Sequence, residues 1–238
     1  MINKIAILAK PASGKTDAIL RIISPQIELF GYKVVSISDR PILNDLVEND
    51  ALKGSLNGDG WYVGTYSWIK YDPSRNKKLR AMSGHLWNLT HQNMIKRMRE
   101  EPVANTVELY EFGIGPKVSF SDEDLLQEAS DIFSWMYDEQ VSQHIAVVEI
   151  DTPFHIRSTN NDDRDPHERM DKKTFDDYFL DGGEGNYSLA QAYGIAHYHN
   201  FQNNRRDPLW FDSQMNDIVT SFIHPLLEGH DPDLMRRR

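Results

Sequence analysis

Apolar residues along the chain gather in five short runs rich in β-branched side chains: residues 4–9, 32–38, 106–112, 144–151 and 193–201. Within each run the apolar character is nearly continuous rather than alternating, which is typical of strands covered on both faces. Amphipathic segments between them predict helices near residues 16–30, 83–100, 121–136 and 212–228. This alternation predicts an α/β fold, a doubly wound five-stranded parallel sheet with helices on both sides.

Two stretches depart from this alternation. Residues 50–75 are rich in Gly, Asn, Asp and aromatic side chains, and residues 152–186 are almost wholly polar. Segments of this length without regular structure are usually functional or disordered. Both follow the end of a predicted strand, and open α/β sheets bind their ligands at the carboxyl ends of their strands.

Composition narrows the classes of protein. The chain has 238 residues, of which 39% are hydrophobic and 26% charged, as in an ordinary globular protein. It has no cysteine, which excludes disulfides, thiolate chemistry and Cys-ligated zinc. No apolar run approaches the length of about 20 residues that spans a bilayer. The first strand begins within a few residues of the N-terminus, so we expect no cleavable signal, no membrane partner and a cytoplasmic location.

The net charge of −10 disfavours generic nucleic-acid binding, which depends on a positive surface. Basic segments at 74–80, 96–99, 203–206 and 236–238 form either solvated faces or a local patch.

A phosphate-binding loop is predicted at residues 4–20, KIAILAKPASGKTDAIL. Such a loop needs a strand, a turn whose backbone N–H groups point inward, and a helix whose N-terminus faces the anion. The candidate nucleotide-binding residues are Lys10, Pro11, Ala12, Ser13, Gly14, Lys15 and Thr16. Ala9 stands where the first glycine of the pattern belongs, and it fits if the backbone there has a negative φ.

With this loop the chain resembles the P-loop kinases, a superfamily that includes nucleoside monophosphate kinases, gluconate-type small-molecule kinases and polynucleotide kinases. The order of elements extends the resemblance over most of the chain, and residues 4–20 carry its specific sequence. The resemblance implies one kinase domain over residues 1–238, with an acceptor-binding insertion at 40–100 and a lid at 152–186. It also implies ATP and Mg²⁺ as cofactors, with Lys15 on the outer phosphates and the Thr16 hydroxyl on the metal.

Two carboxylates at predicted strand ends are candidates for the chemistry. In a P-loop fold the acidic residue that ends the third strand usually holds Mg²⁺ through water, which points to Glu111; an edge carboxylate facing solvent is the alternative. Glu108, three residues earlier, is expected on the opposite face. Asp39 resembles the carboxylate that polynucleotide kinases and some metabolite kinases place beside the acceptor hydroxyl, where it would accept the proton. Its alternative role is a helix N-cap.

The resemblance also assigns basic and amide groups. Arg157 and Arg164, with Arg169 as a third candidate, would close from the lid onto the transferred phosphate through planar guanidinium groups. The same composition also suits a surface loop whose charges pair internally. After the fifth strand, NFQNNRRDP resembles the turn that cups the adenine, with Asn203 or Asn204 at the base.

Candidates for the acceptor side are Arg40, Trp61 and His85; His91, in the same stretch as His85, is a weaker one. Trp61 belongs to the aromatic stretch GWYVGTYSWIKY, at 60–71. Its rings either stack on a base or on single-stranded nucleic acid, or form a small core under the insertion. The segment YEFGIGP lacks the Asp-Gly-x-Pro-Arg-like motif common in nucleoside monophosphate kinases, which weakens a nucleoside monophosphate as the acceptor.

The sequence therefore predicts a P-loop phosphotransferase that moves the γ-phosphoryl group of ATP to a hydroxyl or phosphate of a nucleotide-like or other small acceptor. Alternatives are a polynucleotide or modified-base DNA kinase, and an acceptor-independent NTPase or nucleotide switch. The guanine signature of a GTPase is missing, since NNRRDP is the nearest string. The pattern indicates no oligomeric state.

Overall fold

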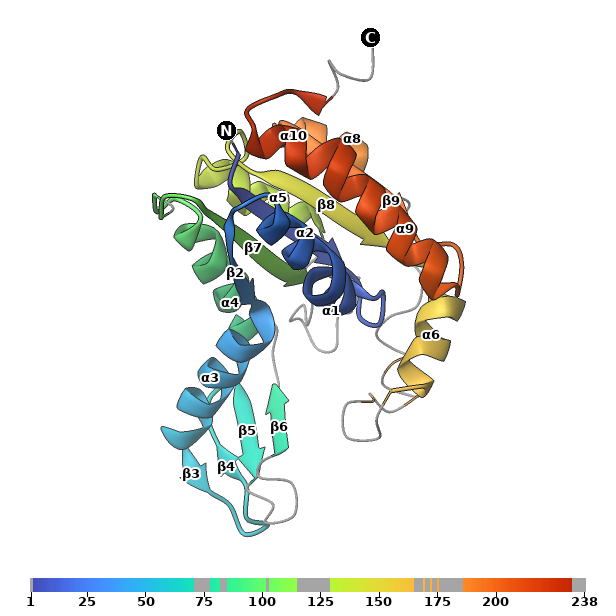
Figure 1. Cartoon of the computed structure of the whole chain (residues 1–238). Helices are drawn as coiled ribbons and strands as arrows, with labels where there is room; N and C mark the ends of the chain where they lie inside the picture. Colours follow the sequence, from blue (N-terminus) through green and yellow to red (C-terminus); the bar gives the residue numbers. More distant parts are fainter. Residues whose placement is uncertain are drawn as a thin grey trace.

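A computed structural model of the chain describes residues 2–70, 78–81, 85–101, 103–114, 129–164 and 186–232, together with residues 169, 172 and 175. Its centre is a five-stranded sheet in the order β2-β7-β1-β8-β9, in which every neighbouring pair is parallel (Figure 1). The strands are β1 (Lys4–Ala9), β2 (Lys33–Ser38), β7 (Thr106–Gly113), β8 (Ala146–Asp151) and β9 (His197–Gln202). The predicted α/β fold is confirmed.

Two long helical segments cover one face of this sheet. The first runs without a break through α1 (Lys15–Asp17), the π-helical η1 (Ala18–Ile23) and α2 (Ser24–Leu29), and Gly31, with a φ of 88°, follows its end. The second comprises α9 (Pro208–Ile218), the π-helical η2 (Val219–Ile223) and α10 (His224–Leu227). It begins earlier than predicted because the Asp207 carboxylate accepts the N–H groups of Leu209 and Trp210 and caps the helix.

The opposite face is covered by α4 (His85–Arg97), α5 (Ala129–Asp138) and α8 (Tyr187–Ala192). The apolar stripe predicted for the third helix is buried where the structure describes it, at Ala129, Ile132, Phe133 and Met136. The predicted start of that helix, at Ser121, lies outside the described residues. The fifth strand begins at His197 rather than at residue 193, because a turn with Gly194 at a φ of 68° follows α8.

The insertion expected between the second and third strands has regular structure of its own. It contains α3 (Asp39–Leu52) and a four-stranded antiparallel sheet of β3 (Ser55–Leu56), β4 (Tyr62–Val63), β5 (Ser67–Lys70) and β6 (Lys78–Ala81). We call residues 39–70 and 78–81 the arm, because they project from the central sheet as a helix packed beside a small sheet (Figure 1). The sequence indicated no regular structure at 50–75. Up to Lys70, where the structure describes it, this stretch contains the short strands β3, β4 and β5.

Side-chain and glycine contacts hold the arm sheet against α3. Ser67 and Ile69 are completely buried, and Ser67 Oγ lies 2.8 Å from both Val47 O and Asp50 Oδ2. Gly54 and Gly64 let backbones approach closely, since a Cβ at Gly54 would lie 1.7 Å from Val63 O.

The polar stretch after β8 begins with a helix, α6 (Phe154–Asp162). Most of the predicted lid beyond Arg164 lies outside the described residues, apart from Arg169, Lys172, Phe175 and Asn186. Within the part of the chain that is described, no helix has the length and apolar character needed to cross a membrane.

Candidate nucleotide and acceptor site

The phosphate loop follows β1 at the carboxyl edge of the sheet. Ala9 is the last residue of the strand, is fully buried and does not have a positive φ. The positive φ values belong to Ala12 (62°) and Gly14 (86°). Gly14 also has a steric role, because a Cβ there would lie 3.3 Å from the ring of Phe211 in α9. The loop therefore takes its turn at Ala12 to Gly14 and leaves Ala9 in extended backbone.

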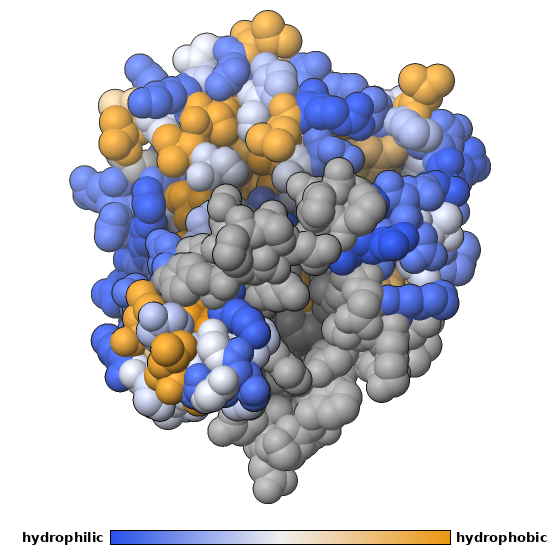
Figure 2. Space-filling view, turned by 90° about the horizontal axis from the view of Figure 1, so that it is seen from below, coloured by the Kyte–Doolittle hydropathy of each residue, from blue (hydrophilic) through white to orange (hydrophobic). Residues whose placement is uncertain are grey.

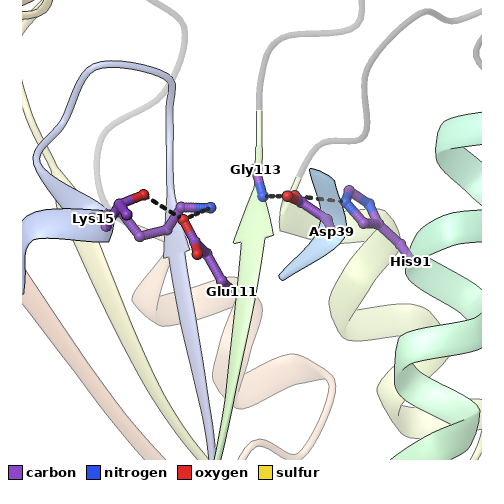
Figure 3. A network of polar contacts seen from close by, with 6 residues as sticks. Lys15, Asp39, His91, Glu111 and Gly113 are labelled. Carbon is purple, nitrogen blue, oxygen red and sulfur yellow. Dashed lines mark hydrogen bonds and ion pairs between the residues drawn. The ribbon is translucent and has the colours of Figure 1, made fainter. Parts of the chain in front are cut away.

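Lys15 and Thr16 open the helix after the loop and face a carboxylate on the neighbouring strand. Thr16 Oγ1 donates to Glu111 Oε1 at 2.8 Å, and Lys15 Nζ lies 3.5 Å from the same oxygen. Glu111 is nearly buried, and the residue three positions earlier points the other way, since Glu108 accepts a hydrogen bond from Tyr110 on the opposite face. The three side chains predicted to serve phosphate and metal therefore lie together (Figure 3).

A second carboxylate lies beside this group, at the start of α3. Ser38 pairs with Glu111 in the sheet, so Asp39 lies one residue further out on the adjacent strand end. Asp39 is buried; its Oδ2 accepts the N–H of Gly113 and lies 3.4 Å from Nε2 of His91 in α4. Figure 3 shows Asp39 between Gly113 and the His91 ring, on the other side of the β7 end from Lys15 and Glu111. The N-cap of α3 is Ser38, so Asp39 does not cap that helix.

The electrostatics of Asp39 favour its ionised form. Burial by itself raises the pKa of this carboxyl, but the Lys15 ammonium, His91 and the Gly113 N–H together outweigh burial and hold the pKa below its ordinary value. Asp39 is therefore a carboxylate at neutral pH, able to accept a proton or a hydrogen bond.

His91 is the residue of this site that the sequence indicated least clearly. It is completely buried between the rings of Trp87 and Phe112, at centroid distances of 5.6 and 5.4 Å, and its Nδ1 has no hydrogen-bond partner among the described residues. His85, preferred from the sequence, is exposed at the start of α4, with its ring 4.4 Å from Tyr66 of the arm. The sequence offered one signal for His91, its spacing in the helix. Since His85 and His91 lie six residues apart, they lie on different faces of α4.

The residues after β8 hold the phosphate loop from its other side. Asn160 Nδ2 of α6 donates to Ala12 O at 3.0 Å, and Thr152 Oγ1 lies 3.5 Å from Ser13 O. Arg157 is completely buried; its Nε donates to Thr152 O at 2.8 Å, and its guanidinium lies over the Phe154 ring. Arg157 thus supports the segment that contacts the loop, and its predicted closure onto a phosphate stays a prediction.

The other predicted site residues lie outside the group formed by Lys15, Glu111 and Asp39. Arg164 and Arg169 are exposed beyond α6, and Arg40 is exposed on the first turn of α3. Asn203 is buried after β9; its N–H donates to Asp151 O at 2.7 Å, while its Oδ1 has no hydrogen-bond partner in the described part of the chain. Trp61 lies in the arm, with its ring 6.3 Å from that of Trp68. The structure brings Lys15, Thr16, Glu111 and Asp39 together, while Arg40, Trp61 and His85, predicted for the acceptor, lie outside this group.

The chain matches no protein-family model and no curated protein. Among solved structures it is similar to an unliganded sugar kinase from Janibacter sp. HTCC2649, with 8% identity and a TM-score of 0.49 over 94% of this chain and 95% of that one. It is also similar to Kti12 from Chaetomium thermophilum in complex with ADP-AlF3, with 13% identity and a TM-score of 0.48 over 92% and 98% of the two chains.

A third similar structure is shikimate kinase from Acinetobacter baumannii in complex with shikimate, with 10% identity and a TM-score of 0.43 over 93% of this chain and 94% of that one.

Proposed function

We propose that this protein is an ATP- and Mg²⁺-dependent kinase that transfers the γ-phosphoryl group to an acceptor held beside Asp39. The observation that carries the proposal is the placement of two carboxylates at neighbouring strand ends near Lys15: Glu111 accepts the Thr16 hydroxyl, and Asp39 is buried on the other side of the β7 end. A nucleotide hydrolase also needs a carboxylate in the position of Glu111. A carboxylate in the position of Asp39 is the group that a phosphoryl acceptor requires.

The nucleotide half of the site fits ATP with magnesium. Backbone N–H groups of the turn and the start of the following helix would hold the phosphates, and Lys15 would reach the outer ones. Mg²⁺ prefers oxygen ligands and commonly uses one or two carboxylates together with substrate phosphates. Thr16 Oγ1 and Glu111 Oε1, 2.8 Å apart, supply oxygens of this kind. The bound metal would offset charge on the phosphates. Asn203 Oδ1, buried without a hydrogen-bond partner among the described residues, supports a contact of Asn203 with the base.

The acceptor half depends on Asp39. Gly113 N–H and His91 both lie on Oδ2, so Oδ1 takes no part in these contacts and is the oxygen assigned to the acceptor. There the carboxylate would accept the proton of an attacking hydroxyl and orient that oxygen toward the γ-phosphorus. Arg40, exposed one residue along α3, would bind an anionic group of the acceptor.

The test is ATP turnover with Mg²⁺ against a panel of nucleosides, nucleotides, sugars and short DNA oligomers. Turnover that rises with one acceptor class and is lost in Lys15→Ala supports the kinase; the exposed Lys33→Ala on β2 is the matched control and keeps turnover. Turnover that ignores every acceptor identifies a hydrolase or nucleotide switch. If wild-type protein binds no nucleotide, the whole assignment is wrong.

A further inference from the structure

The arm sheet has two different faces. Ser67 and Ile69 point to α3 and are completely buried, so alternation along β5 directs Trp68 and Lys70 to the face turned away from α3. Trp61 joins them there, with its ring 6.3 Å from Trp68 and the Lys70 ammonium 5.8 Å above its ring. All three side chains are half-buried. We call Trp61, Trp68 and Lys70 the outer-face cluster.

The next strand, β6, pairs antiparallel with β5. In the pairing of β5 with β6, Arg80 lies opposite Trp68 and Lys78 lies opposite Lys70. The chain as a whole has a net charge of −10, so the Lys70 ammonium over Trp61 is a local positive charge on an acidic protein. Figure 2 shows the molecule from below, with hydrophobic groups gathered in several patches among hydrophilic ones.

Reach decides what kind of ligand this cluster can serve. Ser67, next to Trp68, contacts Val47 and Asp50, which lie eight and eleven residues after Asp39 in α3. At a rise of about 1.5 Å per residue, the cluster lies roughly 12 to 16 Å along the helix from the acceptor carboxylate. A ligand that touches both must be extended. At about 3.4 Å per stacked nucleotide, this span corresponds to roughly four or five nucleotides.

We infer that the outer-face cluster binds single-stranded nucleic acid, and that the acceptor is the end of such a strand. Aromatic rings that stack with any base, combined with cations that follow the backbone, are the features by which proteins bind single strands. α3 begins at Asp39 and packs against this platform through Ser67. The binding step is independent of the chemistry, whereas the identity of the acceptor rests on the proposed function.

Fluorescence anisotropy with 3′-labelled oligothymidylates of 2, 4, 8 and 12 nucleotides tests the binding step. We expect affinity to rise steeply between 2 and 8 nucleotides, and Trp68→Ala to weaken binding of the 12-mer about 5- to 100-fold. Lys70→Glu, a surface change that does not depend on the packing of a large ring, should weaken it as well. Tyr137→Ala and Lys96→Glu, exposed on α5 and α4, are matched controls that bind as wild type.

Several results overturn the inference: no difference between cluster and control variants, affinity that does not depend on length, or self-association in sedimentation that Trp68→Ala abolishes while no oligonucleotide binds. ATP titrations on the same preparations separate the two proposals. ATP binding without length-dependent oligonucleotide binding removes the inference alone, and oligonucleotide binding without ATP binding removes the proposed function alone.

Discussion

Ala9 occupies the position at which a phosphate-binding loop ordinarily carries its first glycine. In this protein it ends β1 in extended backbone, paired with Gly113 and Ile150 on the two neighbouring strands, and its methyl group is buried in the core. Glycine is favoured where φ is positive, and in this loop the positive φ values fall at Ala12 and Gly14 rather than at Ala9. The substitution therefore leaves the course of the loop unchanged.

Ala9→Gly is expected to leave the affinity for Mg²⁺-ATP within about twofold of wild type while lowering the free energy of unfolding. Losing one buried methyl group and adding chain entropy to a central strand costs about 1–2 kcal/mol together. Urea unfolding and nucleotide titration measure the two quantities. A tenfold gain in affinity would instead show that the methyl group obstructs the phosphates.

Asp39→Asn keeps the size of the side chain and removes its ability to accept a proton. We expect the turnover number with acceptor to fall by roughly two to four orders of magnitude, as for loss of a general base, with the ATP dissociation constant unchanged. Asp45→Asn, exposed on the same helix, is the control and keeps full turnover. An unchanged rate in Asp39→Asn would leave this carboxylate with a structural role only.

His91 is expected to act as a positioning residue for Asp39. His91→Phe preserves ring packing against Trp87 and Phe112 but removes the group that faces Asp39. Because His91 is one of the causes that lower the pKa of Asp39, its loss should raise that pKa, so the acid limb of the pH–rate profile moves to higher pH. We expect about tenfold slower turnover with unchanged ATP affinity. A slower rate with an unmoved acid limb would indicate a packing role alone.

At the scale of elements, the sequence predicted the parallel sheet well because a strand buried on both faces leaves a strong apolar signal. The arm left no such signal. Its strands β3 and β4 have two residues each, and β5 has one polar and one apolar residue on each face, Ser67 with Ile69 and Lys70 with Trp68. Short, half-covered strands depend on tertiary contacts with α3, which local pattern does not record.

In the candidate site, too, residues fixed by local pattern differ from residues placed by tertiary packing. Lys15, Thr16 and Glu111 could be predicted because each is fixed by its position relative to a strand end. His91 reaches Asp39 across 52 residues through the packing of α3 on α4, and Asn160 reaches Ala12 across 148 residues from α6. The polar sequence around Arg157 predicts a lid, but this side chain is fully buried and its guanidinium donates to Thr152 O. Polarity along the chain does not reveal such a buried hydrogen bond.

The arm depends on close backbone contacts, which gives it a sharp test. A Cβ at Gly54 would lie 1.7 Å from Val63 O, so Gly54→Ala forces β4 away from the end of α3 and should destabilise the protein by about 1–3 kcal/mol. Gly58→Ala is the matched control: a Cβ there meets nothing within 4 Å, and its φ is not positive. We expect it to be neutral or slightly stabilising. Thermal denaturation of both variants measures the difference, and equal melting temperatures would mean that the arm packs differently.

At the scale of the molecule, the phosphate loop joins the layers of the fold. Gly14 meets Phe211 of α9, Ala12 is held by Asn160 of α6, and Thr16 is bonded to Glu111 in the central sheet. Two helices with π-helical turns, η1 and η2, pack on the same side of the sheet behind the loop. A ligand that binds this loop therefore acts on contacts that hold several elements in place.

Mg²⁺-ATP should consequently stabilise the whole chain against heat. A ligand that binds only the folded state adds about 2.7 kcal/mol at 100 times its dissociation constant, which for a chain of this size raises the melting temperature by roughly 5–10 °C. Differential scanning calorimetry should show this rise in wild type and in Asp39→Asn, because Asp39 lies on the acceptor side. Lys15→Ala should show little or no rise, and Glu111→Gln a rise that depends less on Mg²⁺. Equal shifts in all four proteins would place the nucleotide somewhere other than this loop.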